Sequence, residues 1–164
     1  MRRLMMLLCL SAQAFAPPAF VTPALAQDES PANQIVEGVL ACLSGGGDMG
    51  MTAAMLDTLF WTGGEEGEDG LFYFTPGVGE DTFVYMADDG SFCHVESTSL
   101  DSASASEVLA ATLESQEGTS FFYSQDDAGC TRLDLESGVT VTITSGGNDP
   151  TCASETDAGL RFAF

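Results

Sequence analysis

The chain has 164 residues, of which 25 are acidic and only four are basic, and its formal charge at pH 7 is −21. This charge repels the phosphate backbone of nucleic acids and anionic membrane surfaces, so we expect neither as a partner. Hydrophobic residues still make up 45% of the chain, which is enough for one core and excludes a disordered protein.

The N-terminal segment has the organisation of a secretory signal peptide. Arg2-Arg3 supplies positive charge, an apolar run from Leu4 to Leu10 follows, and Ala24-Leu25-Ala26 offers the small residues that signal peptidase requires. The apolar run is too short to cross a bilayer, so we expect no membrane insertion. We therefore predict a signal peptide over residues 1–26 and one periplasmic or secreted domain over residues 27–164.

Removal of this segment leaves two arginines and all 25 acidic residues, a formal charge of −23. It also leaves four cysteines, and an even number in an oxidising compartment favours two disulfides over free thiols. Three pairings are open. We favour Cys42–Cys93 with Cys130–Cys152, because these bonds tie an N-terminal helix to a strand and close the C-terminal segment.

The first half of the domain begins with two helical stretches. Ser30 followed by Pro31 is typical of a helix start, and Gly45-Gly46-Gly47 ends that helix. Apolar spacing predicts a second helix over residues 51–60. Residues 63–70, rich in glycine and acidic side chains, are expected to form a loop, and residues 71–74 a short strand.

Residues 82–96 have the pattern of a β-hairpin. If Asp88-Asp89-Gly90 is a three-residue loop, Tyr85 lies opposite Cys93 and Phe83 lies opposite Val95. These four side chains are then predicted to share the buried face of the sheet.

The second half repeats this order. Ser104 and Glu107 have the spacing of a capping box at a helix start, and residues 120–123 are predicted as a strand. Residues 132–144 then form a second hairpin around Glu136-Ser137-Gly138, which places Leu133 and Val141 on one face. Alternating apolar residues over 160–164 predict a last strand.

The predicted fold class is α+β, an antiparallel sheet with helices on one face and two disulfides. Residues 51–97 and 104–145 each run from a helix through a short strand to a hairpin. We therefore interpret them as a degenerate tandem helix-strand-hairpin repeat.

Catalytic patterns are sparse. His94 is the one histidine, and in a strand it points to the face opposite Cys93, so the two cannot form a thiolate–imidazole pair. A side chain on the less buried face of a strand is the simpler interpretation of His94. We expect no enzyme; the alternative is a small hydrolase that uses carboxylates.

A binding site is predicted at the acidic loop, which interrupts the repeat. Its candidate residues are Trp61, Glu65, Glu66, Glu68 and Asp69. For Trp61 the alternative is that the indole covers the core behind Leu59 and Phe60.

Calcium is the cofactor that these residues suggest, because Ca²⁺ prefers oxygen ligands. The candidate ligands are Glu65, Glu66, Glu68 and Asp69, together with Asp88 and Asp89 of the first hairpin turn. The spacing does not match an EF-hand loop, so a solvated acidic loop is the alternative.

The acidity itself has two explanations. It favours a basic protein partner, or it adapts an exported protein to high salt, where charge repulsion is screened. The sequence therefore predicts an exported, acidic, non-enzymatic module that acts by protein or small-ligand binding; the alternative is a calcium-stabilised extracytoplasmic domain.

Overall fold

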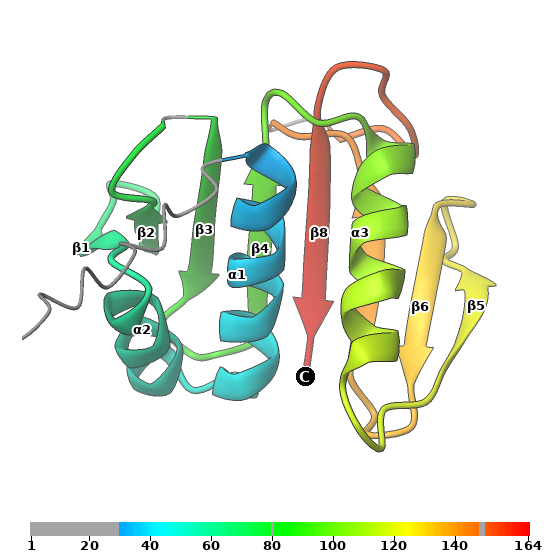
Figure 1. Cartoon of the computed structure of the whole chain (residues 1–164), viewed down its shortest axis with the longest axis horizontal. Helices are drawn as coiled ribbons and strands as arrows, with labels where there is room; N and C mark the ends of the chain where they lie inside the picture. The colour runs from blue at the N-terminus through cyan, green and yellow to red at the C-terminus, as the bar shows by residue number, and fades with distance from the viewer. Residues whose placement is uncertain (1–29, 80, 148–149) are drawn as a thin grey trace, which may run out of the picture.

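The structure is a computed structural model that describes residues 30–79, 81–147 and 150–164. In these ranges the chain forms three helices and one eight-stranded antiparallel sheet. All three helices lie on one face of the sheet (Figure 1). The α+β class predicted from the sequence is thus confirmed, whereas the predicted signal peptide, residues 1–26, lies outside the described residues.

The helices are α1 (Pro31–Gly45), α2 (Met49–Thr58) and α3 (Ser102–Ser115). The predicted start of α1 is confirmed, because the Ser30 side chain accepts a hydrogen bond from the Asn33 amide. The predicted start of α3 is wrong. Asp101, not Ser104, caps the helix by accepting a hydrogen bond from the Ser104 amide at 2.9 Å, so the helix begins one turn earlier.

The strands follow in two sets of four. They are β1 (Thr62–Glu66), β2 (Leu71–Thr75), β3 (Thr82–Ala87), β4 (Phe92–Ser97), β5 (Phe121–Gln125), β6 (Thr131–Leu135), β7 (Thr140–Thr144) and β8 (Ala158–Ala163). The strand order across the sheet is β1-β2-β3-β4-β8-β7-β6-β5, so β4 and β8 meet at the centre.

Each half of the sheet is a four-stranded meander that follows a helix: α2 precedes β1–β4, and α3 precedes β5–β8. The halves match over more of the chain than the sequence predicted. The predicted boundary at residue 145 omits β8, and the predicted acidic loop 63–70 includes all of β1 except Thr62. Glycines at positions 63 and 64 and a bulge obscure that strand in the sequence.

The predicted register of the first hairpin is wrong by one residue. Val84 pairs with Val95 and Met86 with Cys93, so these four side chains face the helices. The connection has four residues, 88–91, rather than three. Phe83 and Tyr85 therefore lie on the face that the helices leave uncovered. The register of the second hairpin is confirmed, because Leu133 pairs with Val141.

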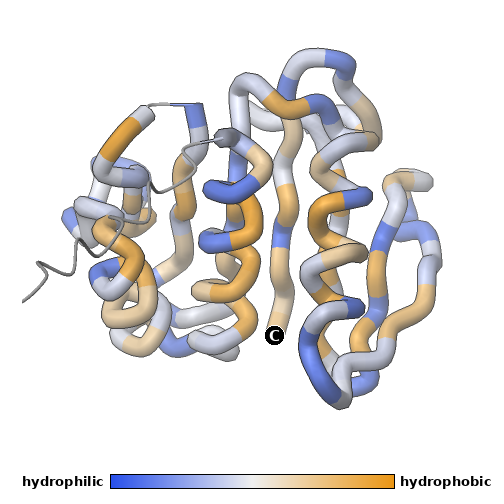
Figure 2. The backbone as a smooth tube through the Cα atoms, viewed as in Figure 1, coloured by the Kyte–Doolittle hydropathy of each residue, from blue (hydrophilic) through white to orange (hydrophobic). Residues whose placement is uncertain are grey.

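The core fills the layer between the helices and the sheet. Ile35 and Val39 of α1 and Leu109 and Leu113 of α3 are fully buried against strand residues such as Leu160. Along α1 and α3, hydrophobic segments alternate with hydrophilic ones, as expected for helices that bury one face (Figure 2).

Both predicted disulfides, Cys42–Cys93 and Cys130–Cys152, are present. The first joins α1 to β4, as the sequence suggested. Two such bonds fit a protein of an oxidising extracytoplasmic compartment. No helix within the described ranges is long and apolar enough to span a bilayer.

Candidate functional site

The face of the sheet that carries no helix, here called the open face, presents one row of side chains that crosses seven strands. Antiparallel pairing places these residues side by side, because directly opposed residues of neighbouring strands point to the same face. In order from β2 to β5 the row is Tyr73, Tyr85, His94, Arg161, Thr142, Arg132 and Ser124. It gathers the one histidine and both arginines of the described chain.

Aromatic rings fill the β2–β4 end of this row. The Tyr85 ring lies at the centre, with its centroid 4.5 Å from the His94 ring, on which it stacks, and 5.5 Å from the Tyr73 ring. Phe83 and Phe92 flank it, each with its ring centroid 6.2 Å away. These spacings are those of interacting aromatic pairs.

His94 is only 6% exposed although it lies on the open face. Its Nε2 atom is buried and forms no hydrogen bond within the described part of the chain. Burial, together with the nearby Arg161 charge, lowers the pKa of His94 to about 3, so the imidazole is neutral at pH 7. The contact of 3.8 Å between Nε2 and the Glu96 carboxylate is therefore not an ion pair.

Glu96 lies two residues further along β4 and is also 6% exposed. Its Oε1 accepts a hydrogen bond from the Gly147 amide at 2.9 Å. Burial raises the pKa of this carboxyl above its ordinary value, and the hydrogen bond from Gly147 acts in the opposite direction. A carboxyl group with a raised pKa beside a neutral imidazole is the kind of arrangement found at functional sites.

The two arginines of the row differ in their partners. Arg132 forms a salt bridge to Asp134, with 2.8 Å between Nε and Oδ1. Arg161 forms no salt bridge with any described carboxylate; its guanidinium carbon lies 4.2 Å from the centroid of the Phe92 ring. This is the geometry of a cation–π interaction.

These side chains surround a hollow of about 500 Å³, here called the open-face hollow. Its aromatic wall consists of Tyr73, Phe83, Tyr85 and Phe92, and its charged groups include Asp69, Glu96 and Arg161. Ligand sites are commonly concave, largely apolar and furnished with a few polar groups. We therefore identify this hollow as the candidate functional site.

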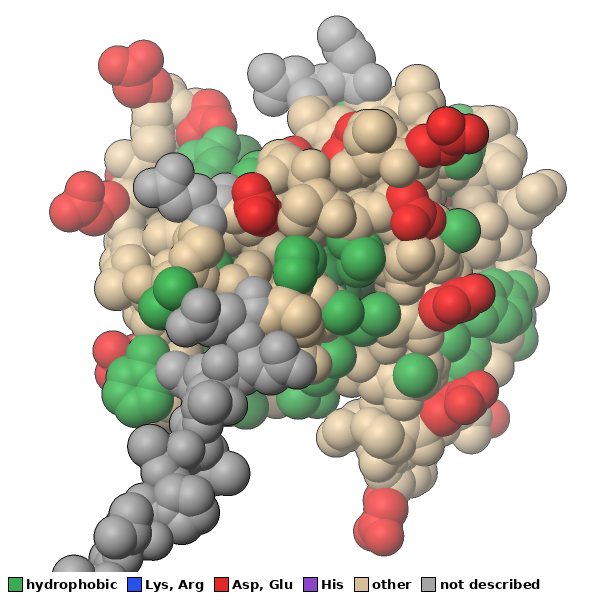
Figure 3. All heavy atoms as spheres, turned by 45° about the horizontal axis from the view of Figure 1, so that its top comes forward, with side chains coloured by type: hydrophobic (Ala, Val, Ile, Leu, Met, Phe, Trp, Pro, Cys, Tyr) green, Lys and Arg blue, Asp and Glu red, His purple; other side chains and the backbone are tan. Residues whose placement is uncertain are grey.

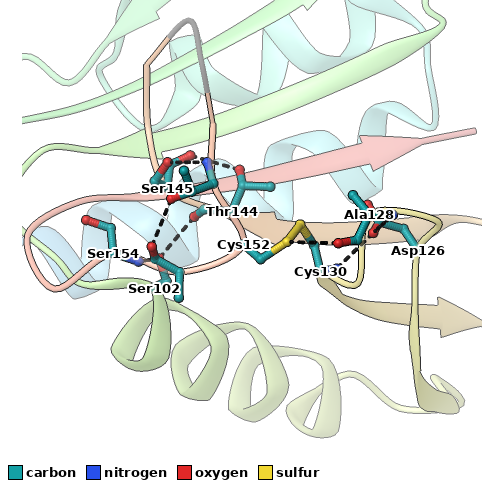
Figure 4. Close-up of a disulfide and its surroundings, with 10 residues drawn as sticks. Ser102, Asp126, Ala128, Cys130, Thr144, Ser145, Cys152 and Ser154 are labelled. Carbon is teal, nitrogen blue, oxygen red and sulfur yellow. Dashed lines mark hydrogen bonds between the residues drawn. A yellow bond between two sulfur atoms is a disulfide. The ribbon is translucent and has the colours of Figure 1, made fainter.

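The wall of the hollow near Glu96 depends on the connection between β7 and β8. The Gly146 amide in this connection donates a hydrogen bond to Asp157 at 2.7 Å. Buried Ser102 at the start of α3 accepts a hydrogen bond from the Ser154 amide at 2.9 Å, and Cys152 is bonded to Cys130 (Figure 4). These contacts fix both ends of the segment that brings Gly147 to Glu96.

Of the predicted binding residues, Trp61 is not a surface residue. It is 3% exposed and belongs to the core, and its Nε1 donates a hydrogen bond to Glu37 at 2.7 Å. The alternative interpretation, an indole that covers the core, is what the structure shows, whereas a binding role of Trp61 remains a prediction. Phe60 beside it is exposed instead.

The predicted acidic loop is divided between a strand and a turn. Glu65 and Glu66 lie on the edge strand β1, whereas Glu68 and Asp69 lie in the turn before β2. Only Asp69 reaches the open-face hollow. It accepts a hydrogen bond of 2.5 Å from the Tyr73 hydroxyl, which lowers the pKa of Asp69 and raises that of Tyr73 to about 12.

The proposed calcium ligands do not gather into one cluster. Asp88 and Asp89 lie in the β3–β4 connection, where Asp89 accepts a hydrogen bond from the Ser91 amide. Across residues 30–79, 81–147 and 150–164, no group of three or more histidine, cysteine or acidic side chains is placed to hold a metal ion. Calcium binding remains a prediction.

The helix-bearing side differs in character. A shallow apolar groove runs between α1 and α3, lined by residues such as Val36, Leu40 and Val108. In the view of Figure 3, hydrophobic side chains gather near the middle, acidic side chains surround them, and no Lys or Arg side chain is seen. Its lining carries no charged side chain, and its polar side chains are Asn33, Thr112, Ser115 and Gln116.

Except for Asp69, the residues of the hollow were not predicted as a site. The sequence did contain a signal, because His94 and Glu96 share one face of β4 and Phe92 precedes them with the same parity. The incorrect register of the first hairpin placed Tyr85 on the opposite face from them.

Comparisons of the chain with protein-family models, with curated proteins and with solved structures found no match.

Proposed function

We propose that this protein is an exported, non-enzymatic binding module that contacts a basic protein partner through the open face of its sheet. The observation that carries the proposal is the open-face hollow, in which aromatic rings and carboxylates surround a half-enclosed space. Aromatic side chains are enriched in the energetically important parts of protein interfaces.

Charge supports a basic partner. The domain that follows the predicted signal peptide carries 25 acidic residues and two arginines. A field of this sign attracts cationic proteins and speeds their association, and the effect weakens as salt is added. The predicted alternative, adaptation to high salt, explains the charge but not the aromatic hollow.

The proposal is tested by capture of partners from the protein's own cell envelope at native salt. The tagged mature protein is compared with the variants Tyr85→Leu and Phe92→Leu, which remove one ring each from the hollow. The matched control is Phe122→Leu, because Phe122 is an exposed aromatic residue of β5 outside the hollow.

We expect the wild-type protein and the control variant to retain a stoichiometric basic protein, and both hollow variants to lose it. The melting temperatures of the two hollow variants should stay within a few degrees of the wild-type value. Equal retention by all four proteins would show that the interaction does not use the hollow. Recovery of the protein alone would contradict a binding module.

A second candidate, the small carboxylate-based hydrolase, is favoured by one observation. Glu96 and Asp69 both line the hollow, and their pKa values are shifted in opposite directions. Such a pair is able to divide the roles of acid and base, with Glu96 giving a proton to a leaving oxygen and Asp69 activating water.

This candidate predicts release of nitrophenol from simple nitrophenyl glycosides or esters by the mature protein, and loss of that activity in Glu96→Gln. If the wild-type protein releases no nitrophenol across such a panel, or if Glu96→Gln is equally active, the hydrolase is rejected.

A further inference from the structure

We propose that the open-face hollow takes a single cationic side chain, a lysine or arginine of the partner, and that Arg161 occupies part of this site as an internal competitor. This inference rests on the proposed function and names the group that the site recognises.

The aromatic wall is the first element of a cation site. Four rings, those of Tyr73, Phe83, Tyr85 and Phe92, line one hollow, and rings of this kind attract ammonium and guanidinium groups through their negative faces. His94, stacked on Tyr85, is neutral and adds no positive charge to the wall.

The carboxylates are the second element. Asp69, Glu96 and Asp126 line the same hollow, against the single guanidinium of Arg161. The lining is therefore acidic as a whole, and it belongs to an acidic protein. An anionic ligand would meet more repulsion than attraction here, whereas a cation would meet both the carboxylates and the aromatic rings of the lining.

Arg161 shows that a guanidinium fits this surface. Its charged group lies over the Phe92 ring at 4.2 Å without a salt bridge to a carboxylate of the described ranges. A cation from a partner would compete with it for the same ring. Removal of the Arg161 charge should consequently strengthen the binding of a cation, whereas it would weaken the binding of an anion.

Arg132 provides a matched control for this substitution. It lies in the same row of the open face, two strands away, because Thr142 pairs with both arginines. It carries the same charge but does not line the hollow. Loss of Arg132 changes the net charge of the protein as much as loss of Arg161 does, but it leaves the Arg161 guanidinium over the Phe92 ring.

The experiment is isothermal titration calorimetry of the mature protein with a blocked peptide that carries one arginine among glycine and serine residues. The second ligand is the same peptide with citrulline, which keeps the shape of arginine and lacks its charge. Both are titrated into the wild-type protein, Arg161→Gln and Arg132→Gln at physiological salt.

We expect the citrulline peptide to bind about tenfold more weakly than the arginine peptide. Arg161→Gln should bind the arginine peptide several-fold more tightly than the wild-type protein, and Arg132→Gln should change its affinity little. If Arg161→Gln weakens binding, if both variants strengthen it equally, or if the arginine peptide does not bind, the inference is overturned.

The two proposals can fail separately. If arginine and citrulline peptides bind equally and Tyr85→Leu abolishes both, the hollow is a binding site but not a cation site. If the capture experiment shows no dependence on the hollow, the proposed function fails whatever the peptides do.

Discussion

His94 on β4 lies directly opposite Arg161 on β8, at the seam where the two four-stranded halves of the sheet meet. The two side chains differ in their environment, because His94 is buried and Arg161 is exposed. The loss of solvent on burial, together with the fixed positive charge of Arg161, disfavours protonation of the imidazole. The centre of the open face is thus polar but carries a neutral histidine.

The lowered pKa of His94 makes the free energy of unfolding depend on pH. It is about 3 in the folded protein against an ordinary value of 6.5, so between these pH values the unfolded chain binds the extra proton. The contribution of His94 is complete above pH 6.5 and is lost as the pH falls toward 3.

We predict that the free energy of unfolding in urea falls between pH 6.5 and 4 more steeply for the wild-type protein than for His94→Phe. The groups that face His94 are Tyr85, Glu96 and Arg161. The raised pKa of Glu96 acts with the opposite sign, because that group favours the folded state at low pH. Identical slopes for the two proteins would contradict a neutral, buried His94.

Trp61 should govern stability rather than binding. Trp61→Ala removes a buried indole and its hydrogen bond to Glu37, and should reduce the free energy of unfolding by about 3–5 kcal/mol. The exposed control Glu65→Gln should change it by less than about 0.5 kcal/mol. A loss of partner capture by Trp61→Ala at unchanged stability would restore the binding role predicted from the sequence.

Gly38 allows α1 to lie close to the sheet. A Cβ atom at this position would lie 2.8 Å from Val95 Cγ1, a distance that requires the neighbouring atoms to move. We predict that Gly38→Ala destabilises the protein by about 1–3 kcal/mol although alanine favours helices. Gly50→Ala in α2, where no core side chain stands so close, should be neutral or stabilising; equal effects of the two substitutions would contradict this packing argument.

Calcium should stabilise the protein no more than sodium. The carboxylates predicted as ligands are spread over β1 and two turns, so added cations act on them mainly by screening. We expect equal melting temperatures in calcium chloride and in sodium chloride of matched ionic strength. A clearly higher melting temperature in calcium would establish the calcium-stabilised domain that the acidic stretches suggested.

Strand register could be predicted from the sequence where only one face of each strand is apolar. The hairpin of β6 and β7 was predicted in register because its apolar residues alternate with polar ones: Leu133 lies between Arg132 and Asp134, and Thr142 separates Val141 from Ile143. In β3 both faces are apolar, with Phe83 and Tyr85 on one and Val84 and Met86 on the other, so alternation could not decide which face is buried.

The candidate site was missed for a further reason. Its members come from strands far apart in the sequence, and Arg161 reaches Phe92 only because β8 inserts beside β4. Such an insertion depends on the long-range order of the strands, which local patterns do not encode. The acidic stretch was predicted as a binding site because its charged residues are adjacent in the sequence, yet only Asp69 of that stretch lines the hollow.

If the arginine peptide binds to the open face, backbone amide resonances of that face should shift when the ¹⁵N-labelled mature protein is titrated with the peptide. We predict shifts confined to β2, β3, β4 and β8, with the largest at Tyr85, Phe92 and Arg161. Shifts centred on the groove between α1 and α3, or no shifts, would show that the peptide does not bind to the open face.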